Sequence, residues 1–193
     1  MPKVRFTYSE VWCDRRHYLN EADVSVVLSR LPREDWQGLR AVHFNDRSWG
    51  ARILGYANPR ARDISICALP PEISLTRFLV RGQSPELFGA VRGSRWPEVA
   101  VRRFLLYDVL LHEIGHLRIV REGARTGRLW HAREKLAQKF GDEWRRRLWV
   151  DRFDHPDPAH NPPSAREVNL SRLLKLSRAG QAYWVEPDLK PLH

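Results

Sequence analysis

The run PEVAVRRFLLYDVLLHEIGHLRIVRE, at positions 97–122, constrains the fold of this chain more than any other stretch. Proline suits the first turn of a helix, where its missing N–H group is not needed, so a long helix is expected to begin at Pro97. Gly123 and Gly127 follow the run, and glycine is common just past the end of a helix. Leucine and isoleucine flank position 112 on most sides, which predicts that this helix is substantially buried.

The apolar part of this helix contains the ionisable side chains of His112, Glu113 and His116, in that order. Residues four apart lie on one helix face, so both histidines can aim a ring nitrogen at one point. Zn²⁺ accepts such nitrogens at about 2.0–2.1 Å, and catalytic zinc sites keep one position open for water. Glu113 lies on the neighbouring flank, where it can take a proton from that water instead of binding the metal. Because buried polar groups need partners, the pattern favours a metal site over a plain core helix.

A catalytic zinc site needs a third protein ligand. The extended metzincin pattern would require glycine at 119 and histidine at 122, but these positions are Ile119 and Glu122, which excludes that pattern. The next expected helix, at 129–149, carries His131 and Glu134 three positions apart and therefore on one face. Either residue could be the third ligand while the other orients a ligand or the substrate. The spacing alone leaves this choice open.

The motif HEIGHL, followed by EKLAQKFG at 134–141, resembles the ImmA/IrrE-type zinc metallopeptidases, whose second helix carries the pattern E-x-x-A-N-x-F-A. The matching positions are Glu134, Ala137, Gln138 in place of the Asn, Phe140, and Gly141 in place of the Ala. This resemblance implies a zincin-like metallopeptidase of the gluzincin type. It also implies that one Zn²⁺ is bound by two histidines and a glutamate, with Glu134 as the third ligand beside His112 and His116.

A second resemblance is to the SprT-like proteases, in which a histidine about fifteen positions beyond the helix motif completes the metal site. His131 lies fifteen positions after His116. This resemblance implies His131 as the alternative third ligand, and a protease that is recruited to DNA. Both resemblances cover only the two helices that carry the motifs and the residues around them.

The rest of the chain predicts an α+β fold, because strand patterns come first and helix patterns later. Strands are expected at 4–12, at 39–44 and in a hairpin at 51–69, with a helix capped by Asn20 between the first two. Within the hairpin, residues 64–69 are either an edge strand that binds peptide by β-augmentation or an ordinary core strand. We expect a zincin-like domain with a small N-terminal sheet at 1–150. A proline-rich arm and a short helix at 151–193 should pack on the same domain.

The predicted reaction is the hydrolysis of peptide bonds in a peptide or protein substrate, with one Zn²⁺ as cofactor. Glu113 would accept the proton of the attacking water and pass it to the leaving amine, while the metal polarises the scissile carbonyl. The oxyanion would need a further donor, for which the candidates are His131, Tyr56 and the arginines at 118–133. The chain is therefore a candidate hydrolase of the metalloprotease class.

The net charge of the chain indicates which kinds of partner it could attract. The 193 residues include 28 arginines and five lysines, and the formal net charge is +10. Such a surface would attract nucleic acid or an acidic partner, although arginines on solvated faces explain the same composition. The alternative function is a basic zinc-containing module that binds nucleic acid or protein without hydrolysis, or a SprT-like DNA-associated protease.

The same sequence gives expectations about the compartment. No apolar run approaches the ~18 residues that a membrane span needs, and no apolar signal-peptide region follows the N-terminus. Cys13 and Cys67 are too few for a disulfide framework or a cysteine-based zinc site. His155 and His160 fall in the proline-rich arm, where exposed histidines are expected to have no special role. We therefore expect no membrane partner and a soluble, cytoplasmic protein.

Overall fold

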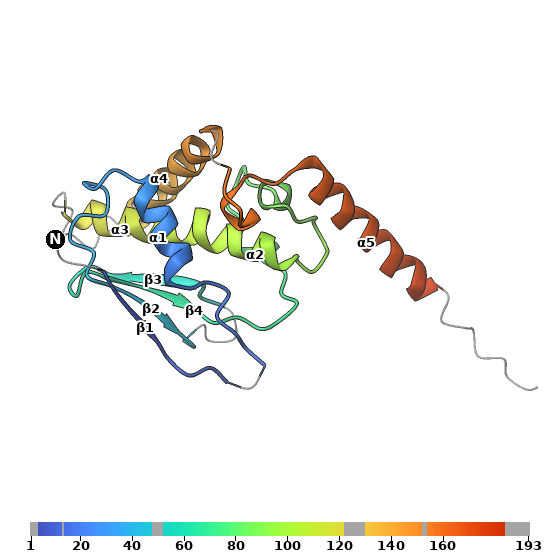
Figure 1. Cartoon of the computed structure of the whole chain (residues 1–193), viewed down its shortest axis with the longest axis horizontal. Coiled ribbons are helices and arrows are strands. Elements are labelled where there is room, and N and C mark those ends of the chain that lie inside the picture. Colours follow the sequence, from blue (N-terminus) through green and yellow to red (C-terminus); the bar gives the residue numbers. More distant parts are fainter. Residues whose placement is uncertain (1–3, 13, 48–51, 122–129, 152–153, 184–193) are drawn as a thin grey trace, which may run out of the picture.

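The computed structural model describes residues 4–12, 14–47, 52–121, 130–151 and 154–183. Most of its helices lie on one face of a four-stranded sheet (Figure 1). The strands are β1 (Arg5–Tyr8), β2 (Ala41–Asn45), β3 (Gly55–Asn58) and β4 (Asp63–Cys67), in the spatial order β1-β2-β4-β3. The strands β1, β2 and β4 are parallel, whereas β3 runs antiparallel to β4. The structure is therefore of the mixed α+β class, and β3 and β4 form the expected hairpin.

Successive side chains of a strand point to opposite faces of the sheet, and the face that carries most of the apolar side chains is buried. Val42 and Phe44 of β2 stand beside Ile64 and Ile66 of β4, and each of the four is at most 2% exposed. Neighbouring apolar residues on paired strands thus build the part of the core that lies under the helices.

The strand order decides between the two expectations for residues 64–69. Most of this segment is β4, which lies between β2 and β3, so it is a core strand and the edge-strand expectation is wrong. Among the described residues β3 pairs only with β4, and it forms the sheet edge that lies against the long buried helix. Side-chain alternation predicts which face of a strand is buried but not which strand ends the sheet, which is why the sequence could not decide this.

The first helix, α1 (Glu21–Arg30), connects β1 to β2 and begins where expected. The side chain of Asn20 accepts a hydrogen bond from the backbone N–H of Asp23, and the Asp23 carboxylate accepts one from the N–H of Asn20. This reciprocal capping box satisfies two N–H groups that have no partner inside the helix.

The run that follows Pro97 forms one continuous helix whose middle is not α-helical. It consists of α2 (Glu98–Phe104), a π-helical segment η3 (Leu105–Leu110) and α3 (Leu111–Arg121). Every residue of η3 is at most 8% exposed, so the middle of the helix is buried as predicted. Single π-helical turns are rare and occur frequently at functional sites. This one ends two positions before His112.

The other helices surround the buried helix or extend past it. The helix α4 (Trp130–Val150) packs across α3, and α5 (Ala165–Tyr183) is the last described element. Short 3₁₀ turns lie in the connections, namely η1 (Thr76–Phe78), η2 (Pro85–Phe88) and η5 (Pro158–His160). Each helix within the described ranges is too short or too polar to cross a lipid bilayer.

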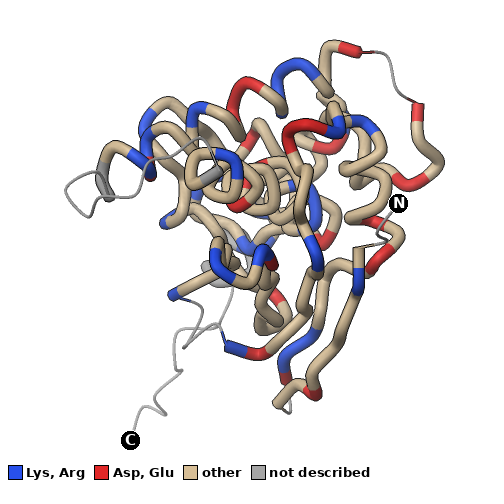
Figure 2. Tube along the Cα trace, turned by 90° about the vertical axis from the view of Figure 1, so that its left-hand side faces the viewer, with Lys and Arg blue, Asp and Glu red and all other residues tan. Residues whose placement is uncertain are grey.

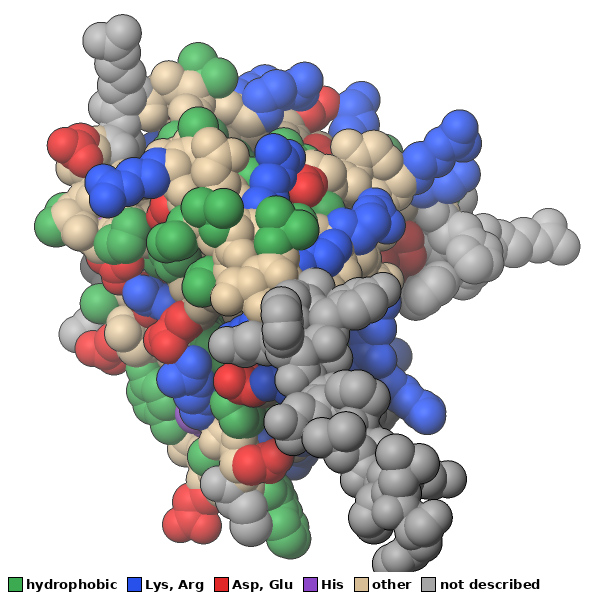
Figure 3. Space-filling model, turned by 90° about the vertical axis from the view of Figure 1, so that its right-hand side faces the viewer, with side chains coloured by type: hydrophobic (Ala, Val, Ile, Leu, Met, Phe, Trp, Pro, Cys, Tyr) green, Lys and Arg blue, Asp and Glu red, His purple; other side chains and the backbone are tan. Residues whose placement is uncertain are grey.

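A buried arginine attaches the C-terminal segment to the body of the molecule. Arg103 is 1% exposed, and its guanidinium donates hydrogen bonds of 2.9 Å to the carbonyl oxygens of Pro158 and Asn161 and to the Glu167 carboxylate. The first turn of α5 is therefore packed on the body, and further along α5 Lys175 donates a hydrogen bond of 2.7 Å to the carbonyl oxygen of Arg92. In Figure 1 the helix extends to one side of the molecule. The exposed leucines of α5 are Leu170, Leu173, Leu174 and Leu176. In Figure 3, which faces this end of the molecule, hydrophobic and basic side chains lie side by side.

Candidate metal centre

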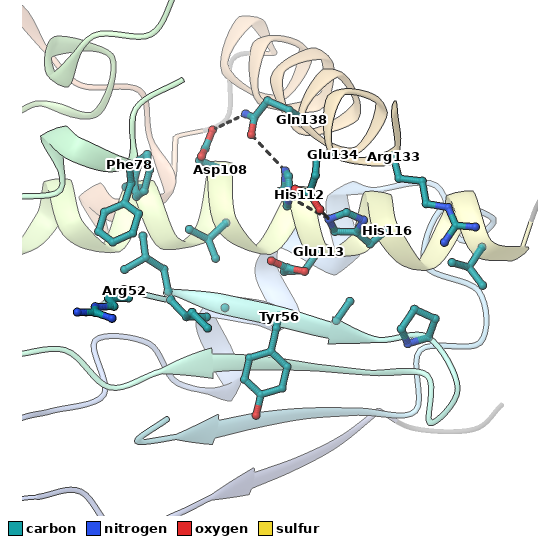
Figure 4. A pocket seen from close by; sticks show the side chains of 18 residues that line it. Arg52, Tyr56, Phe78, Asp108, His112, Glu113, His116, Arg133, Glu134 and Gln138 are labelled. Carbon is teal, nitrogen blue, oxygen red and sulfur yellow. Dashed lines mark hydrogen bonds and ion pairs between the residues drawn. The ribbon is translucent and has the colours of Figure 1, made fainter. Parts of the chain in front are cut away.

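His112, His116 and Glu134 bring three ligand atoms together where α3 and α4 cross (Figure 4). The Nε2 atoms of the two histidines are 3.0 Å apart, and each lies 3.3 Å from an oxygen of Glu134. Ligand atoms about 2.0–2.1 Å from one ion and at tetrahedral angles would be roughly 3.4 Å apart. Two imidazoles and a carboxylate are also a donor set that zinc accepts. Both the atoms and their separations therefore fit a zinc ion with a fourth position left open.

The close crossing of α3 and α4 depends on Gly115. A Cβ atom at this position would lie 3.0 Å from the Cα atom and 3.1 Å from the carbonyl oxygen of Ala137. Backbone atoms cannot move aside as a flexible side chain can, so glycine at this point lets Glu134 reach both histidines. Gly141, also at the crossing, is less constrained, because the nearest atom to its Cβ would be the backbone nitrogen of His112 at 3.4 Å.

Gly115→Ala is expected to separate the two helices and to weaken zinc binding, whereas Gly141→Ala should be tolerated. Overpacking costs about 1–3 kcal/mol, so the Tm of the Gly115 variant should fall. At position 141, alanine makes an ordinary contact and removes the roughly 1 kcal/mol penalty of glycine in a helix, so the Tm should be unchanged or higher. The Tm and the zinc content of the two purified variants check this prediction. Equal values for both variants would contradict the role of Gly115.

Glu113 lies between α3 and the edge strand β3 and is not part of the ligand cluster (Figure 4). Burial raises the pKa of its carboxyl group to about 8, a hydrogen bond from the backbone of Ala57 opposes this rise, and the charge of Glu134 adds to it. A cation at the ligand cluster would lower the pKa of Glu113 again, because it favours the charged form. The carboxyl group is therefore suited to exchange a proton near neutral pH.

The environment of His116 favours a neutral imidazole. Burial lowers its pKa, and the charge of His112 lowers it further, while the Glu134 carboxylate raises it. The charge of Arg133 also lowers the pKa of His116. Because a metal binds the neutral ring, these effects together favour the form that can act as a ligand.

A cavity of about 750 Å³ opens onto the ligand cluster and onto Glu113. In Figure 4 the cavity lies between α3 and α4 on one side and β3 on the other. Phe78, Phe104 and Val109 make part of its lining apolar, and Arg52 also contributes to it. A substrate in this cavity would therefore lie between the ligand cluster and the edge of the sheet.

Some backbone N–H and C=O groups of β3 face this cavity and not the neighbouring strand β4. The N–H groups of Cys67 and Arg62 donate to the carbonyl oxygens of Leu54 and Asn58, which are therefore turned toward the β4 side. In an antiparallel pair such residues alternate with residues whose polar groups face outward. By this alternation the backbone groups of Gly55 and Ala57 face the free edge, and the hydrogen bond from Ala57 to Glu113 agrees with this.

Comparison with known proteins identified no relative of this chain. No family model, curated protein or solved structure matches the chain. The resemblances to the ImmA/IrrE-type and SprT-like proteases therefore rest on their short motifs, and the function has to be argued from the side chains of the chain itself.

One expected oxyanion donor, Tyr56, is wrongly placed for that role. Its hydroxyl oxygen accepts a hydrogen bond of 3.1 Å from the side-chain amide of Asn45, and the ring points away from the cavity (Figure 4). Successive strand residues point to opposite faces of a sheet, and Tyr56 lies between Gly55 and Ala57, which face the helices. The same alternation that turns these two residues toward the cavity turns the phenol away.

The other expected donors are placed differently from one another. Arg118 pairs with the Asp35 carboxylate at 2.7 Å, whereas Arg133 lines the cavity. The side chain of His131 and those of the arginines at 121–128 lie outside the described residues. Among the described candidates, Arg133 is therefore the cation next to the ligand cluster.

Sequence reasoning missed a group of polar side chains behind His112. The Nδ1 atom of His112 lies 3.2 Å from Oε1 of Gln138, whose amide nitrogen donates to Asp108 at 3.1 Å and to Asp142 at 3.3 Å. Arg145 forms ion pairs with both carboxylates. A signal was present, because Asp108 stands four positions before His112, and Asp142 stands four positions after Gln138. These spacings could not be interpreted from the sequence, because the sequence does not show that the two helices cross.

A second cluster of possible ligand atoms consists of Asp23, Asp157 and His160. Here Arg102 already supplies the positive charge, since its guanidinium lies 2.6 Å from Asp23 and 2.5 Å from Asp157. His160 is 2% exposed and lies 3.2 Å from the hydroxyl group of Tyr107, so the expectation of an exposed histidine is wrong for this residue. The cluster is an ion-pair network that joins α1, α2 and the C-terminal segment.

Proposed function

We propose that the protein is a zinc-dependent metallopeptidase with a zincin-like domain of the gluzincin type. In this proposal His112, His116 and Glu134 bind one Zn²⁺, and Glu113 is the general base. The observation that supports it is the convergence of three ligand atoms beside a buried carboxyl group, on the wall of a cavity. A structural zinc site usually has four protein ligands, whereas this cluster has three among the described residues and a carboxyl group suited to proton transfer.

The residues around the cluster account for the steps of hydrolysis. Zinc bound there would polarise the scissile carbonyl and lower the pKa of a water toward neutrality. Glu113 accepts a proton from the attacking water and returns it to the leaving amine. The hydrogen bond from the backbone of Ala57 keeps the carboxyl group of Glu113 at the cavity. Arg133 places a positive charge on the cavity wall, where it can stabilise the developing oxyanion.

The edge of β3 supports an extended peptide as the substrate. An extended chain can pair with the outward-facing backbone groups of a sheet edge by β-augmentation. Because Ala57 already bonds Glu113 through its backbone, pairing would use its carbonyl oxygen and the polar groups of Gly55. The apolar lining from Phe78, Phe104 and Val109 would receive an apolar side chain of the substrate.

The basic excess of the chain does not by itself favour the alternative of a nucleic-acid-binding module. Figure 2 shows Asp and Glu interspersed with Lys and Arg along the trace, without a single basic stripe on the side in view. Nucleic-acid-binding proteins typically gather their basic residues on one face or along one helix.

The proposal is tested by metal analysis together with a peptidase assay. The purified protein should bind about one zinc ion per chain, and it should cleave casein or an extended peptide. Removal of the metal by a chelator should abolish cleavage, and added Zn²⁺ should restore it. A protein that binds no zinc, or one that binds zinc and cleaves none of these substrates, would contradict the proposed function.

A further inference from the structure

The following inference rests on the proposed role of His112 as a zinc ligand and concerns what prepares this histidine to bind. A neutral imidazole can bind a metal through one nitrogen only when its proton is on the other. The Nε2 atom of His112 faces His116 and Glu134, and its Nδ1 atom lies 3.2 Å from Oε1 of Gln138. The tautomer that can bind zinc in the cluster is therefore the one with the proton on Nδ1.

The orientation of the Gln138 amide decides whether Nδ1 of His112 meets an acceptor or a donor. The amide nitrogen lies 3.1 Å from Oδ1 of Asp108 and 3.3 Å from Oδ1 of Asp142. Turning the amide over would place its oxygen against two carboxylates and its NH₂ group against Nδ1. The two carboxylates thus select the orientation in which the amide oxygen accepts a hydrogen bond from the Nδ1 proton.

Asp108 is the stronger of these two anchors because it is buried and held from several sides. Its side chain is 7% exposed, whereas the Asp142 side chain is 39% exposed. Besides Gln138, its Oδ1 atom accepts hydrogen bonds from Arg145 at 2.8 Å and from Gln83 at 2.6 Å. With several donors converging on Oδ1, even a protonated Asp108 would carry its proton on Oδ2 and still present Oδ1 to Gln138.

Asp108 and its partner Arg145 come from two different helices that meet at the metal centre. Asp108 lies in the π-helical segment η3, one turn before His112, and Arg145 lies two turns after Gln138 on α4. Arg145 is 7% exposed and bonds both Asp108 and Asp142, so it holds the two carboxylates on the same side of the Gln138 amide. A buried arginine that bonds two carboxylates is costly to assemble, and here the network ends on a candidate metal ligand.

We propose that Asp108 is a positioning residue for the metal centre: acting through Gln138, it holds His112 in the tautomer that presents Nε2 to zinc. Asp142 and Arg145 support it. The order of contacts is carboxylate, amide, imidazole and metal, so Asp108 affects the metal without touching it.

The tautomer can be measured directly in metal-free protein labelled with ¹⁵N. Long-range ¹H–¹⁵N spectra at neutral pH distinguish a protonated Nδ1 from a protonated Nε2, and the signals of His112 are identified by their loss in His112→Gln. The expected result is the Nδ1–H tautomer in the wild-type protein. A proton on Nε2 of His112 would overturn the inference. This measurement requires no zinc, so it tests the tautomer of His112 separately from the metal proposal.

Variants of Asp108 show whether its hydrogen-bond acceptor or its negative charge matters for zinc binding. Asp108→Ala and Gln138→Leu should each weaken zinc binding by roughly 10–100-fold in a chelator competition, as loss of such outer partners does. Asp108→Asn retains an oxygen at the Oδ1 position and should keep both the tautomer and most of the affinity. Gln83→Ala is the matched control, because it removes a donor to Asp108 and leaves Gln138 its acceptor.

The comparison of these variants has two decisive outcomes. An Asp108→Asn protein that behaves like wild type while Asp108→Ala loses zinc would support the inference. If Asp108→Ala bound zinc with wild-type affinity, or if Gln83→Ala lost as much affinity as Asp108→Ala, the network would be a structural element only. If Asp108→Ala does not fold, the tautomer of the wild-type protein still decides the matter.

Discussion

Glu113→Gln should retain zinc and lose hydrolysis. Glutamine has the same shape as glutamate and can still accept the hydrogen bond from Ala57, but it cannot take a proton from water. General acid–base catalysis contributes about 10²–10⁴-fold, so kcat should fall by a factor in that range. The measurement is kcat with an extended peptide, beside the zinc content and the Tm of the same preparation.

A matched control for this variant is Glu98→Gln. Glu98 is an exposed glutamate of α2 that pairs with Arg16 at the surface, so its replacement should leave zinc, Tm and kcat near wild type. If Glu113→Gln cleaved peptide as fast as this control, Glu113 would not be the general base. If it lost zinc as well as activity, Glu113 would belong to the metal site and not to proton transfer.

Glu134→Ala should empty the metal site. The variant leaves two imidazoles whose Nε2 atoms are 3.0 Å apart, without the carboxylate that lies 3.3 Å from each of them. A direct ligand should matter more than the outer partners of a ligand, whose loss costs 10–100-fold, so we expect zinc affinity to fall by more than about 100-fold. Zinc content after dialysis against a chelator measures this effect, and peptide hydrolysis should be lost with the metal.

The natural comparison is His131→Ala, three positions earlier on the same helix. We expect this variant to keep its zinc, because Glu134 supplies the third ligand. The reverse pattern, with zinc retained in Glu134→Ala and lost in His131→Ala, would make His131 the ligand, as the SprT-like resemblance implies. The pair therefore separates the two resemblances without any knowledge of the substrate.

Local spacing accounts for the parts of this protein that could be predicted from the sequence. The helix cap at Asn20, the hairpin and the long helix after Pro97 depend on contacts within a few residues, and the structure has all of them. In the same way, a separation of four residues places His112 and His116 on one helix face. Such features hold in almost any tertiary setting, because they follow from backbone geometry.

Features that depend on neighbouring elements could not be predicted in this way. Whether residues 64–69 end the sheet depends on the parallel pairing of β4 with β2, and the direction of Tyr56 depends on the face that β3 turns to the helix. Arg103 looks like any other arginine of a basic chain, yet the folded C-terminal segment buries it. Each of these outcomes is set by packing between segments that lie far apart in sequence.

The sequence by itself determined a helix with two histidines on one face and a glutamate on its flank. The tertiary structure decided what surrounds that helix. The crossing at Gly115 brings Glu134 to the histidines, the edge of β3 bonds Glu113, and the network of Asp108, Arg145 and Gln138 reaches the far nitrogen of His112. The physical reason is distance: a helical repeat relates residues within a turn, whereas ligand geometry requires side chains from separate elements to meet within about 3 Å, which only packing achieves.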